Sequence, residues 1–426
     1  MKKWFLYGGL VVALAIPLAL WLPGYLQAGP GDFPCEFGRL FGLTGFTLAL
    51  FQVGLSSRLK IFERGMGLDK LMGAHRLAGL FGFSFMLAHP VFHFTSDFIN
   101  LGYPVLKWPM LLGLGAFLLA ILTIGTAILF KKIKIRYGTW KGLHWVNFFL
   151  IPIVFTHSML LGTDINAQPL LKYWWIVLGA AYIALVTAIV VDRIKARRHP
   201  YQVTEVVKET PDTWSLHLKG PAVDHKPGQF AILTLHREGQ KPEAHPFTLA
   251  SSPLEKDLSV SVKAVGDFTS TIKDTTTADR AVISAPFGTF SFLNYDAPNL
   301  VFIAGGIGIT PFMSMLRYMA AQNIKRNVLL LWGNKTEHDI AFRNELNKIS
   351  ARMPTFRMVH VLSSQPDWVG EKGYIDQALL QKYLDGFDNP QFFVCGPPVM
   401  MDKMVKTLLD MKVPENRIHF ERFALR

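Results

Sequence analysis

Five of the thirteen histidines fall within long apolar segments, where their spacing indicates chemistry. They lie in the segments 72–95 and 143–162: His75, His89, His93, His144 and His157. Ionisable side chains are costly inside a bilayer and are functional candidates by default. A single histidine could make an interhelical hydrogen bond, but two segments that each carry a widely spaced pair favour cofactor binding. Because imidazole is an axial ligand of haem iron, the pattern predicts haem.

The spacing within each segment predicts how these histidines pair. His75 and His89 are 14 residues apart, so on an α-helix they share one face and lie about 21 Å apart along the axis. If both segments cross the membrane in the same direction, His75 is level with His144, and His89 is level with His157. Each level can hold one haem between two imidazoles. We therefore predict two b-type haems, one near each leaflet, with these four residues as axial ligands.

Two details complicate this pairing. His144 and His157 are 13 residues apart, which leaves them about 140° out of phase on an ideal helix. Pro152 lies between them and lacks a backbone donor, so we expect local rewinding or a kink there. His93, one turn beyond His89, is an alternative outer ligand. His89 is preferred because only its spacing gives a full pair with His75 across the membrane.

Long apolar runs predict the helices that must carry these residues. A span needs about 20 apolar residues, and six segments qualify: 4–25, 36–56, 72–95, 109–130, 143–162 and 171–192. The first could be a cleavable signal peptide, but its apolar stretch is long and no small-x-small cleavage site stands near Gln27, which favours a retained span. The fold class expected for this half is a six-helix transmembrane bundle, over residues 1–195.

Charge in the connecting loops predicts the orientation of these spans. Lys and Arg are abundant in three segments, namely 57–71, 131–142 and the stretch after Asp192, whereas the other three loops contain one basic residue, Lys107. By the positive-inside rule, the N-terminus and everything after the last span are cytoplasmic. We expect a multi-pass protein of the bacterial inner membrane, with lipid as its principal surroundings.

The overall charge excludes some functions. The formal net charge of +13 arises mainly from basic residues that flank apolar runs, and no recognition-helix pattern is present, so no nucleic-acid partner is expected. Cys35 and Cys395 are the two cysteines, which excludes a disulfide framework or a zinc cluster. The spans contain almost no Asp or Glu, which argues against a proton pump. Arg39, in the second span, is either a partner for a haem propionate or an interfacial arginine that snorkels outwards.

The second half of the chain has the pattern of a water-soluble protein. Short alternating strands separated by Gly and Pro turns predict a small antiparallel β-barrel over 200–295, with strands at 201–208, 213–219, 229–236, 258–264 and 281–285. Residues 296–426 then alternate strand and helix, which predicts a parallel α/β nucleotide-binding domain. Its elements are expected at 299–304, 310–322, 327–332, 338–350 and 356–362, with a last strand at 391–394.

Two strand ends in this domain carry glycine and proline. The first strand is followed by Gly305-Gly306-Ile307-Gly308-Ile309-Thr310-Pro311-Phe312. Glycines allow close backbone approach to a phosphate or a ring, and the following helix offers free N–H groups to an anion. The last strand ends in Cys395-Gly396-Pro397-Pro398. For Cys395, a small buried apolar side chain is the usual alternative to a functional role.

Five segments of the second half together resemble the ferredoxin–NADP reductase superfamily, and within it the NADPH oxidase and ferric reductase branch. The segments are His245–Ser251, Val262–Thr269, Pro286–Gly288, Gly305–Phe312 and Cys395–Pro397. The membrane half resembles the six-helix ferric reductase-type domain, with histidine pairs at spacings of 14 and 13 on its third and fifth helices. The resemblance thus covers nearly the whole chain.

The resemblance implies two sets of cofactor contacts, and no catalytic residue beyond them. It places FAD against His245, Pro246, Phe247, Thr248, Ser251, Lys263, Gly266, Thr269 and the terminal aromatic Phe423. It places NADPH against Gly305, Gly306, Gly308, Thr310, Pro311, Lys335, Cys395, Gly396 and Pro397. Thr248 is expected near the isoalloxazine, Lys263 near the pyrophosphate, and Thr310 and Cys395 near the nicotinamide. Three residues follow Phe423 here, whereas the related oxidases often end on the aromatic.

The resemblance also implies a reaction, in which NADPH reduces FAD and electrons then pass singly to the inner and the outer haem. A basic residue after the second strand of the nucleotide domain favours a 2′-phosphate, so Lys335 favours NADPH, with NADH as the alternative. The acceptor expected at the outer face is dioxygen, which would yield superoxide. The alternatives are a ferric or other metal substrate, and a periplasmic electron-acceptor protein.

Overall fold

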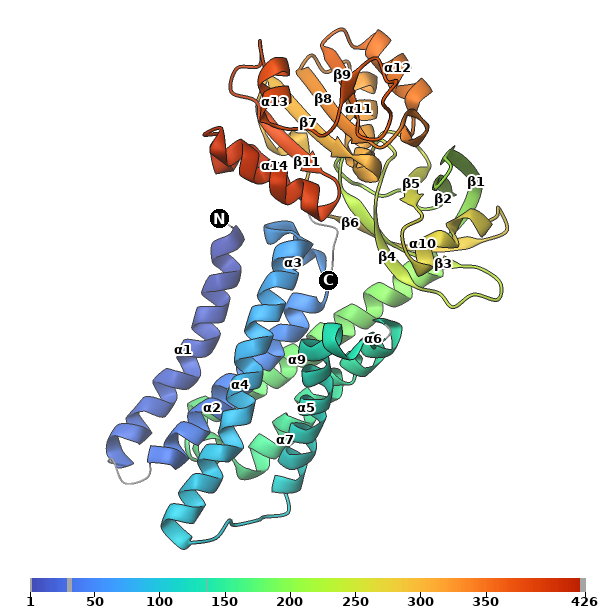
Figure 1. Cartoon of the computed structure of the whole chain (residues 1–426). Helices are drawn as coiled ribbons and strands as arrows, with labels where there is room; N and C mark the ends of the chain where they lie inside the picture. The colour runs from blue at the N-terminus through green and yellow to red at the C-terminus, as the bar shows by residue number, and fades with distance from the viewer. Residues whose placement is uncertain (1, 29–32, 136, 422–426) are drawn as a thin grey trace. The chain divides into compact units, whose positions relative to one another are not determined.

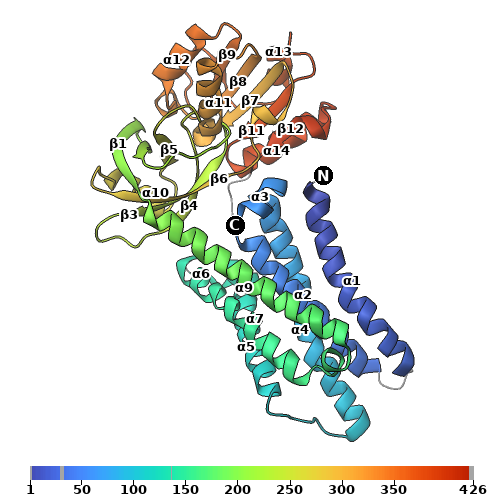
Figure 2. The same cartoon turned by 180° about the vertical axis from the view of Figure 1, so that it is seen from behind.

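The computed structural model describes residues 2–28, 33–135 and 137–421 of the chain. The chain divides into two compact units, Met1–Val191 and Asp192–Arg426 (Figures 1 and 2). The first unit is helical, and the second contains both β-sheets. The predicted architecture of a helical membrane part, an antiparallel barrel and a parallel α/β sheet is therefore confirmed.

Six stretches of helix in the described part of the chain are long and apolar enough to cross a membrane, as predicted. The long helices are α1 (Lys2–Ala28), α2 (Phe33–Ser56), α4 (Leu68–Leu101), α5 (Met110–Ile133) and α9 (Pro169–Arg198), and the remaining stretch combines α6 (Tyr137–Trp145) with α7 (Asn147–Leu161). Helices α3 (Lys60–Met66) and α8 (Thr163–Ala167) are short connections. Helix α4 continues past the predicted end of its span at residue 95.

Large apolar side chains occupy both the inside and the outside of this helical unit. Phe46 of α2 stacks on Trp175 of α9 with ring centroids 4.8 Å apart, and Trp175 Nε1 donates to Ser158 Oγ on α7 at 2.8 Å. Other large apolar residues, such as Leu77 and Phe81 on α4, are exposed. Such a broad exposed apolar surface is typical of helices that face lipid.

The fifth span is interrupted at Val146, not at Pro152 as the sequence predicted. The Val146 N–H donates to the Leu143 carbonyl at 3.1 Å, and the Phe149 N–H donates to the Val146 carbonyl at 2.9 Å. These bonds to the third preceding residue tighten the chain into a 3₁₀-like turn. Pro152 lies inside the continuous helix α7. Because proline has no N–H, it leaves the Phe148 carbonyl without its helical partner, and the Tyr182 hydroxyl of α9 donates to that carbonyl instead.

The first sheet of the second unit is a closed antiparallel barrel. Its strand order is β4-β3-β6-β1-β2-β5, and a bridge between Leu249 and Val260 joins the end of β4 to β5. The strands are β1 (Tyr201–Thr210), β2 (Thr213–Lys219), β3 (Phe230–His236), β4 (Ala244–Thr248), β5 (Leu258–Lys263) and β6 (Arg280–Phe287). Strand β4 was not predicted, because Pro246 and two polar residues interrupt its alternation. The short helix α10 (Asp267–Ser270) follows β5.

The second sheet is parallel, in the order β10-β9-β8-β7-β11-β12. Its strands are β7 (Asn299–Gly305), β8 (Asn327–Asn334), β9 (Phe356–Leu362), β10 (Glu371–Lys372), β11 (Gln391–Cys395) and β12 (Ile418–Phe420). Helices α11 (Thr310–Ala321) and α12 (Arg343–Arg352) pack on one face through Phe312 and Leu346. Helices α13 (Gln377–Tyr383) and α14 (Pro398–Asp410) pack on the other through Leu380 and Met404. Buried residues dominate every central strand, as expected for a sheet covered on both faces.

The helix predicted at 338–350 begins later, at Arg343. Thr336 and Asp339 form a capping box around a 3₁₀ turn at Glu337–Asp339. Phe342 then adopts a left-handed backbone with φ of 54°, which separates that turn from α12. The sequence pattern did not distinguish a capped turn from the first turn of the helix.

Arg317 connects the barrel to the parallel sheet. Its Nη1 donates to the Ala250 carbonyl at 2.7 Å, and its Nε and Nη2 donate to the two carboxylate oxygens of Glu345 at 2.7 and 2.6 Å. Ser314, one turn earlier on α11, donates to the Ser251 carbonyl at 2.7 Å. These bonds hold the segment after β4 against α11.

We expect Arg317→Ala to lower the free energy of unfolding of the second unit by about 2 kcal/mol, because the buried Ala250 carbonyl loses a charged donor. Denaturant unfolding of the full chain in detergent, followed by tryptophan fluorescence, measures this change. Arg352→Ala, at an exposed position at the end of α12, is the control and should leave the midpoint unchanged. Equal midpoints for both variants would contradict the assignment.

Candidate functional site

The first unit brings the four predicted axial histidines together as two pairs. The ring centroids of His75 and His144 lie 6.1 Å apart, and those of His89 and His157 lie 6.4 Å apart. The planes of the paired rings cross at 78° and 88°. The turn at Val146 allows His144 and His157 to face α4 together, although an ideal helix would leave them out of phase.

The separation of the rings fits a metal ion held between them. An imidazole nitrogen binds a transition-metal ion at about 2.0 Å, so two rings on opposite sides of one ion have centroids about 6 Å apart. Both separations in the structure are close to that value. The described residues contain no cluster of three or more His, Cys, Asp or Glu that could hold a metal ion by side chains alone. Each pair thus offers two imidazole ligands to one metal ion, and the remaining ligands would belong to a cofactor that carries the metal.

Main-chain carbonyls orient three of the four imidazoles. The Nδ1 atom of His89 lies 2.8 Å from the Gly38 carbonyl, that of His157 lies 3.0 Å from the Pro109 carbonyl, and that of His75 lies 3.3 Å from the Gln52 carbonyl. A carbonyl only accepts, so each Nδ1 carries the proton and each Nε2 keeps its lone pair. This is the tautomer that a metal ligand needs, and such second partners also fix the orientation of the ring.

Glycines provide the space for the imidazoles of the outer pair. A Cβ atom at Gly113 on α5 would lie 2.6 Å from Cε1 of His157. A Cβ atom at Gly42 on α2 would lie 2.9 Å from Nδ1 of His89. Real Cβ atoms do not approach other atoms so closely, so any larger residue at either position would displace the ring. Neither glycine was identified from the sequence.

His93 lies beside the outer pair. Its ring centroid is 4.9 Å from that of His89, and its Nδ1 lies 4.0 Å from Cys35 Sγ. The ring that faces His157 is that of His89, which supports the preference for His89 as the ligand. Arg39 donates to Glu36 at 2.7 Å and to Asp164 at 3.3 Å, so it links α2 to α8.

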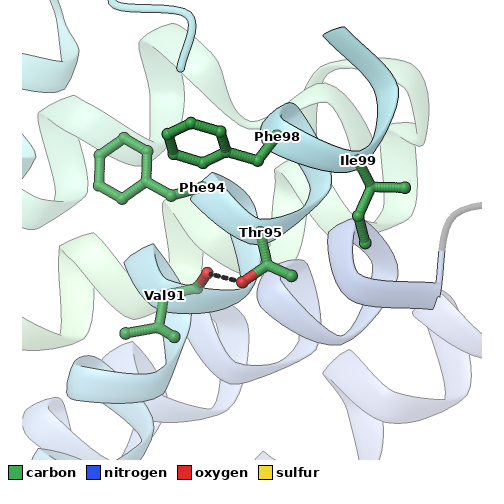
Figure 3. Close-up of a pocket in the computed structure, with 5 residues that line it drawn as sticks. All are labelled: Val91, Phe94, Thr95, Phe98 and Ile99. Carbon is green, nitrogen blue, oxygen red and sulfur yellow. Dashed lines mark hydrogen bonds between the residues drawn. The ribbon is translucent and has the colours of Figure 1, made fainter. Parts of the chain in front are cut away.

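A shallow groove near the end of α4 contains no titratable group. Its lining residues are Val91, Phe94, Thr95, Phe98 and Ile99, all from α4 (Figure 3). The Thr95 hydroxyl donates to the Val91 carbonyl of its own helix at 2.8 Å. The groove is therefore an apolar surface and adds no chemistry to the histidine pairs.

In the second unit, the two predicted nicotinamide segments meet at the carboxyl edge of the parallel sheet, where nucleotides bind in open α/β sheets. A Cβ atom at Gly308 would lie 2.8 Å from Cα of Gly396, and one at Gly305 would lie 2.9 Å from Cδ of Pro397. Gly306 has a φ of +52°. Pro311 occupies the first turn of α11, and the Thr310 hydroxyl donates to the Ile307 carbonyl at 3.1 Å. Glycine is thus required where the two turns touch.

Cys395, at the end of β11, is buried. Burial, together with the negative charge of the Glu421 carboxylate, raises the pKa of its thiol. Glu421 is 5% exposed and its carboxylate lies against Gly288, so it joins the turn after β6 to the end of β11. Glu421 was not predicted from the sequence, where the one feature that could have indicated it is its position two residues before the expected terminal aromatic. That aromatic, Phe423, lies outside the described residues.

Buried polar atoms gather at the ends of β8 and β9. Asn334 is 7% exposed, and neither end of its amide has a hydrogen-bond partner among the described residues. Nδ1 of His360 is also buried and has no hydrogen-bond partner among the described residues. Burial lowers the pKa of His360 to about 4, so its imidazole is neutral. Buried polar groups are normally paired, so these atoms fit a ligand such as a nucleotide. The predicted contact Lys335 follows directly and is exposed.

The predicted flavin segment forms β4 and the turn after it. The His245 ring stacks on Phe268 with centroids 4.1 Å apart, and Thr248 is buried at the end of the strand, after Pro246 and Phe247. Ser251 is fully buried, and its hydroxyl accepts a bond from the Ser259 N–H at 3.0 Å.

The second predicted flavin segment follows β5. Nζ of Lys263 lies 3.0 Å from Asp212 and 3.8 Å from Asp339. The Thr269 hydroxyl accepts from the N–H groups of Val265 and Gly266, both at 2.9 Å. The Thr269 side chain therefore closes the turn that contains Gly266. The role of these residues as flavin contacts stays a prediction.

Comparison with known families matches three consecutive parts of the chain. Residues 41–155 match the ferric reductase like transmembrane component, residues 200–300 an FAD-binding domain, and residues 302–406 the oxidoreductase NAD-binding domain. The chain therefore combines a ferric reductase-like transmembrane part with an FAD-binding domain and an oxidoreductase NAD-binding domain. The predicted family resemblance is confirmed.

Individual relatives match part of the chain. The glycine betaine monooxygenase reductase of Chromohalobacter salexigens is 29% identical over 53% of this chain and 64% of its own length. The reductase component of phenol 2-monooxygenase from a Pseudomonas species is 29% identical over 52% of this chain and 64% of its own. Among solved structures, a cytochrome P450 reductase of Amycolatopsis has 27% identity and a TM-score of 0.48, and covers 53% of this chain and 69% of its own. The chain thus spans less than two thirds of the curated relatives it matches.

We expect Cys395 to resist alkylation in the folded protein. Its raised pKa keeps the thiol protonated at pH 8, where an unperturbed thiol with a pKa of about 8.5 is partly ionised. Iodoacetamide treatment followed by peptide mass spectrometry measures labelling of each cysteine, with the guanidinium-unfolded protein as the control. Labelling of Cys395 at pH 8 as fast in the folded as in the unfolded chain would contradict this assignment.

Proposed function

We propose that this protein transfers electrons from NADPH, through FAD and two b-type haems, to an acceptor on the outer side of the bacterial inner membrane. The proposal rests on the two imidazole pairs, in each of which the separation of the ring centroids fits one metal ion between the rings. His75 and His89 are 14 residues apart on one helix, so the two levels lie about 21 Å apart. That distance covers most of a hydrocarbon core about 30 Å thick.

The chain's own residues position the cofactors. When bound, FAD accepts a hydride from the nicotinamide and releases single electrons, which haem iron can carry. His75 and His144 would hold one haem, and His89 and His157 the other, with carbonyls such as that of Gly38 fixing the rings. The neutral Cys395 thiol would present an uncharged surface to the nicotinamide, in keeping with the raised pKa of that thiol.

The polar ends of β8 and β9 support binding of the adenosine half of the dinucleotide. The unpartnered amide of Asn334 and the neutral imidazole of His360 can each bond to ribose or adenine. Lys335, next to them, favours the 2′-phosphate of NADPH over the 2′-hydroxyl of NADH. NADH remains the alternative, and a comparison of KM for the two nucleotides decides between them.

Dioxygen is the acceptor that we propose, with superoxide as the product. One NADPH supplies two electrons, which reduce two dioxygen molecules to two superoxide ions and leave NADP⁺ and one proton. The described connections at the proposed outer face are short, namely Gly102–Pro109 and Gly162–Gln168, and contain no folded domain. A ferric chelate is the second candidate, favoured by the match of residues 41–155 to the ferric reductase like transmembrane component.

The haem assignment predicts a selective effect at Gly113. Gly113→Ala should displace the His157 ring and remove about half of the haem absorbance per protein, as His157→Leu should. Gly115→Ala, two residues along α5, is the matched control, because a Cβ atom there meets nothing within 4 Å. Pyridine haemochrome absorbance per protein measures the content. A wild-type protein without a reducible Soret band would overturn the haem assignment altogether.

The acceptor is tested by adding NADPH and FAD to the purified protein and following reduction of a superoxide-specific dye. We expect a signal that superoxide dismutase abolishes. A dismutase-insensitive signal together with rapid reduction of ferric chelates would replace dioxygen with ferric iron. Slow turnover with both small acceptors, and a co-purifying protein, would indicate a periplasmic partner instead.

A further inference from the structure

The surroundings of His144 differ from those of the other three axial candidates. Its Nδ1 lies 3.3 Å from Nδ2 of Asn147, whose Oδ1 lies 2.5 Å from the Thr123 hydroxyl on α5. The Thr123 hydroxyl in turn lies 2.8 Å from the Leu119 carbonyl. A side-chain amide and a hydroxyl therefore stand where the other imidazoles have a carbonyl alone.

One arrangement of protons is compatible with His144 as a metal ligand. Thr123 has one hydroxyl proton and cannot donate to both Leu119 and Asn147. If it donates to the Leu119 carbonyl, its oxygen must accept from Asn147, and the amide must turn its NH₂ group towards Thr123. The amide oxygen then faces His144 and accepts from Nδ1–H. Rotating an amide by 180° exchanges these roles without moving its heavy atoms appreciably.

The opposite arrangement conflicts with ligation. If Asn147 donates to Nδ1, the His144 proton must move to Nε2, where it would block a metal. The orientation with Nδ1 protonated is therefore the one that leaves Nε2 of His144 free for a metal ion.

We propose that Asn147 and Thr123 are positioning residues that hold His144 with its Nε2 lone pair towards His75 and set the reduction potential of that one haem. This inference rests on the haem assignment in the proposed function. The break at Val146 makes the contact available, because it places Asn147 at the first turn of α7, three residues after His144. An acceptor on Nδ1–H makes an imidazole a stronger donor to the metal and so stabilises the ferric state.

The test is a spectroelectrochemical titration of the purified full-length protein. Thr123→Val keeps the shape of the side chain but removes the hydroxyl, so the Asn147 amide loses its anchor. We expect the midpoint potential of one haem to rise while that of the other stays unchanged, and Thr123→Ser to restore the wild-type value. Thr156→Val is the control, since the Thr156 hydroxyl donates to the Pro152 carbonyl of its own helix and is exposed.

Asn147→Leu removes the acceptor itself, and we expect it to lower the occupancy of that same haem, up to loss of half of the haem absorbance. If this variant does not fold, the Thr123→Val and Thr123→Ser pair decides alone. Two haems with wild-type potentials in Thr123→Val would overturn the positioning role of Thr123 and Asn147 and leave the proposed function intact. A wild-type protein that binds no haem would overturn the proposed function instead.

Discussion

Water cannot reach polar groups inside a hydrocarbon layer, so a polar group in the first unit loses a hydrogen bond unless the chain supplies its partner. This constraint explains why the histidines are held by carbonyls of neighbouring helices and do not simply point into a cavity. Each Nδ1 that bonds to a carbonyl satisfies two groups at once and fixes which nitrogen faces the opposite ring. The same requirement accounts for Tyr182, whose hydroxyl serves the carbonyl that Pro152 leaves without a helical partner.

Close approach of the helices follows from that requirement. A carbonyl can accept from an imidazole on another helix only if the two backbones lie near each other, and a side chain at the crossing point would keep them apart. Glycines at 42 and 113 stand at such points beside His89 and His157. Small residues at helix crossings are a general feature of membrane bundles. Here they also determine where the imidazole rings can lie.

Sequence reasoning predicted the features that depend on local pattern. The spans follow from runs of apolar residues, and the strands of both sheets follow from alternation and from Gly and Pro turns. It did not place the break at Val146, because the apolar run passes through that residue without Gly or Pro. Nor could it identify Asn147 or Asn334, which are unremarkable in sequence and gain a role only from neighbours distant in the chain. Strand β4 was missed because Pro246 breaks the alternation. A residue without an N–H is tolerated there because, on its side away from β3, the strand region is joined to β5 only by the bridge between Leu249 and Val260.

Close backbone contact also shapes the second unit. At the carboxyl edge of its parallel sheet, the main chains of Gly308 and Gly396 touch, so that region leaves little room for a mobile side chain. Two titratable groups of this edge, Cys395 and His360, are uncharged near neutral pH, because burial raises the pKa of the thiol and lowers that of the imidazole. The Glu421 carboxylate also contributes to the raised pKa of the thiol, so the end of β11 faces a negative charge. The positive charge of Lys335 lies on the exposed side of this edge, where a phosphate can reach it while keeping contact with water.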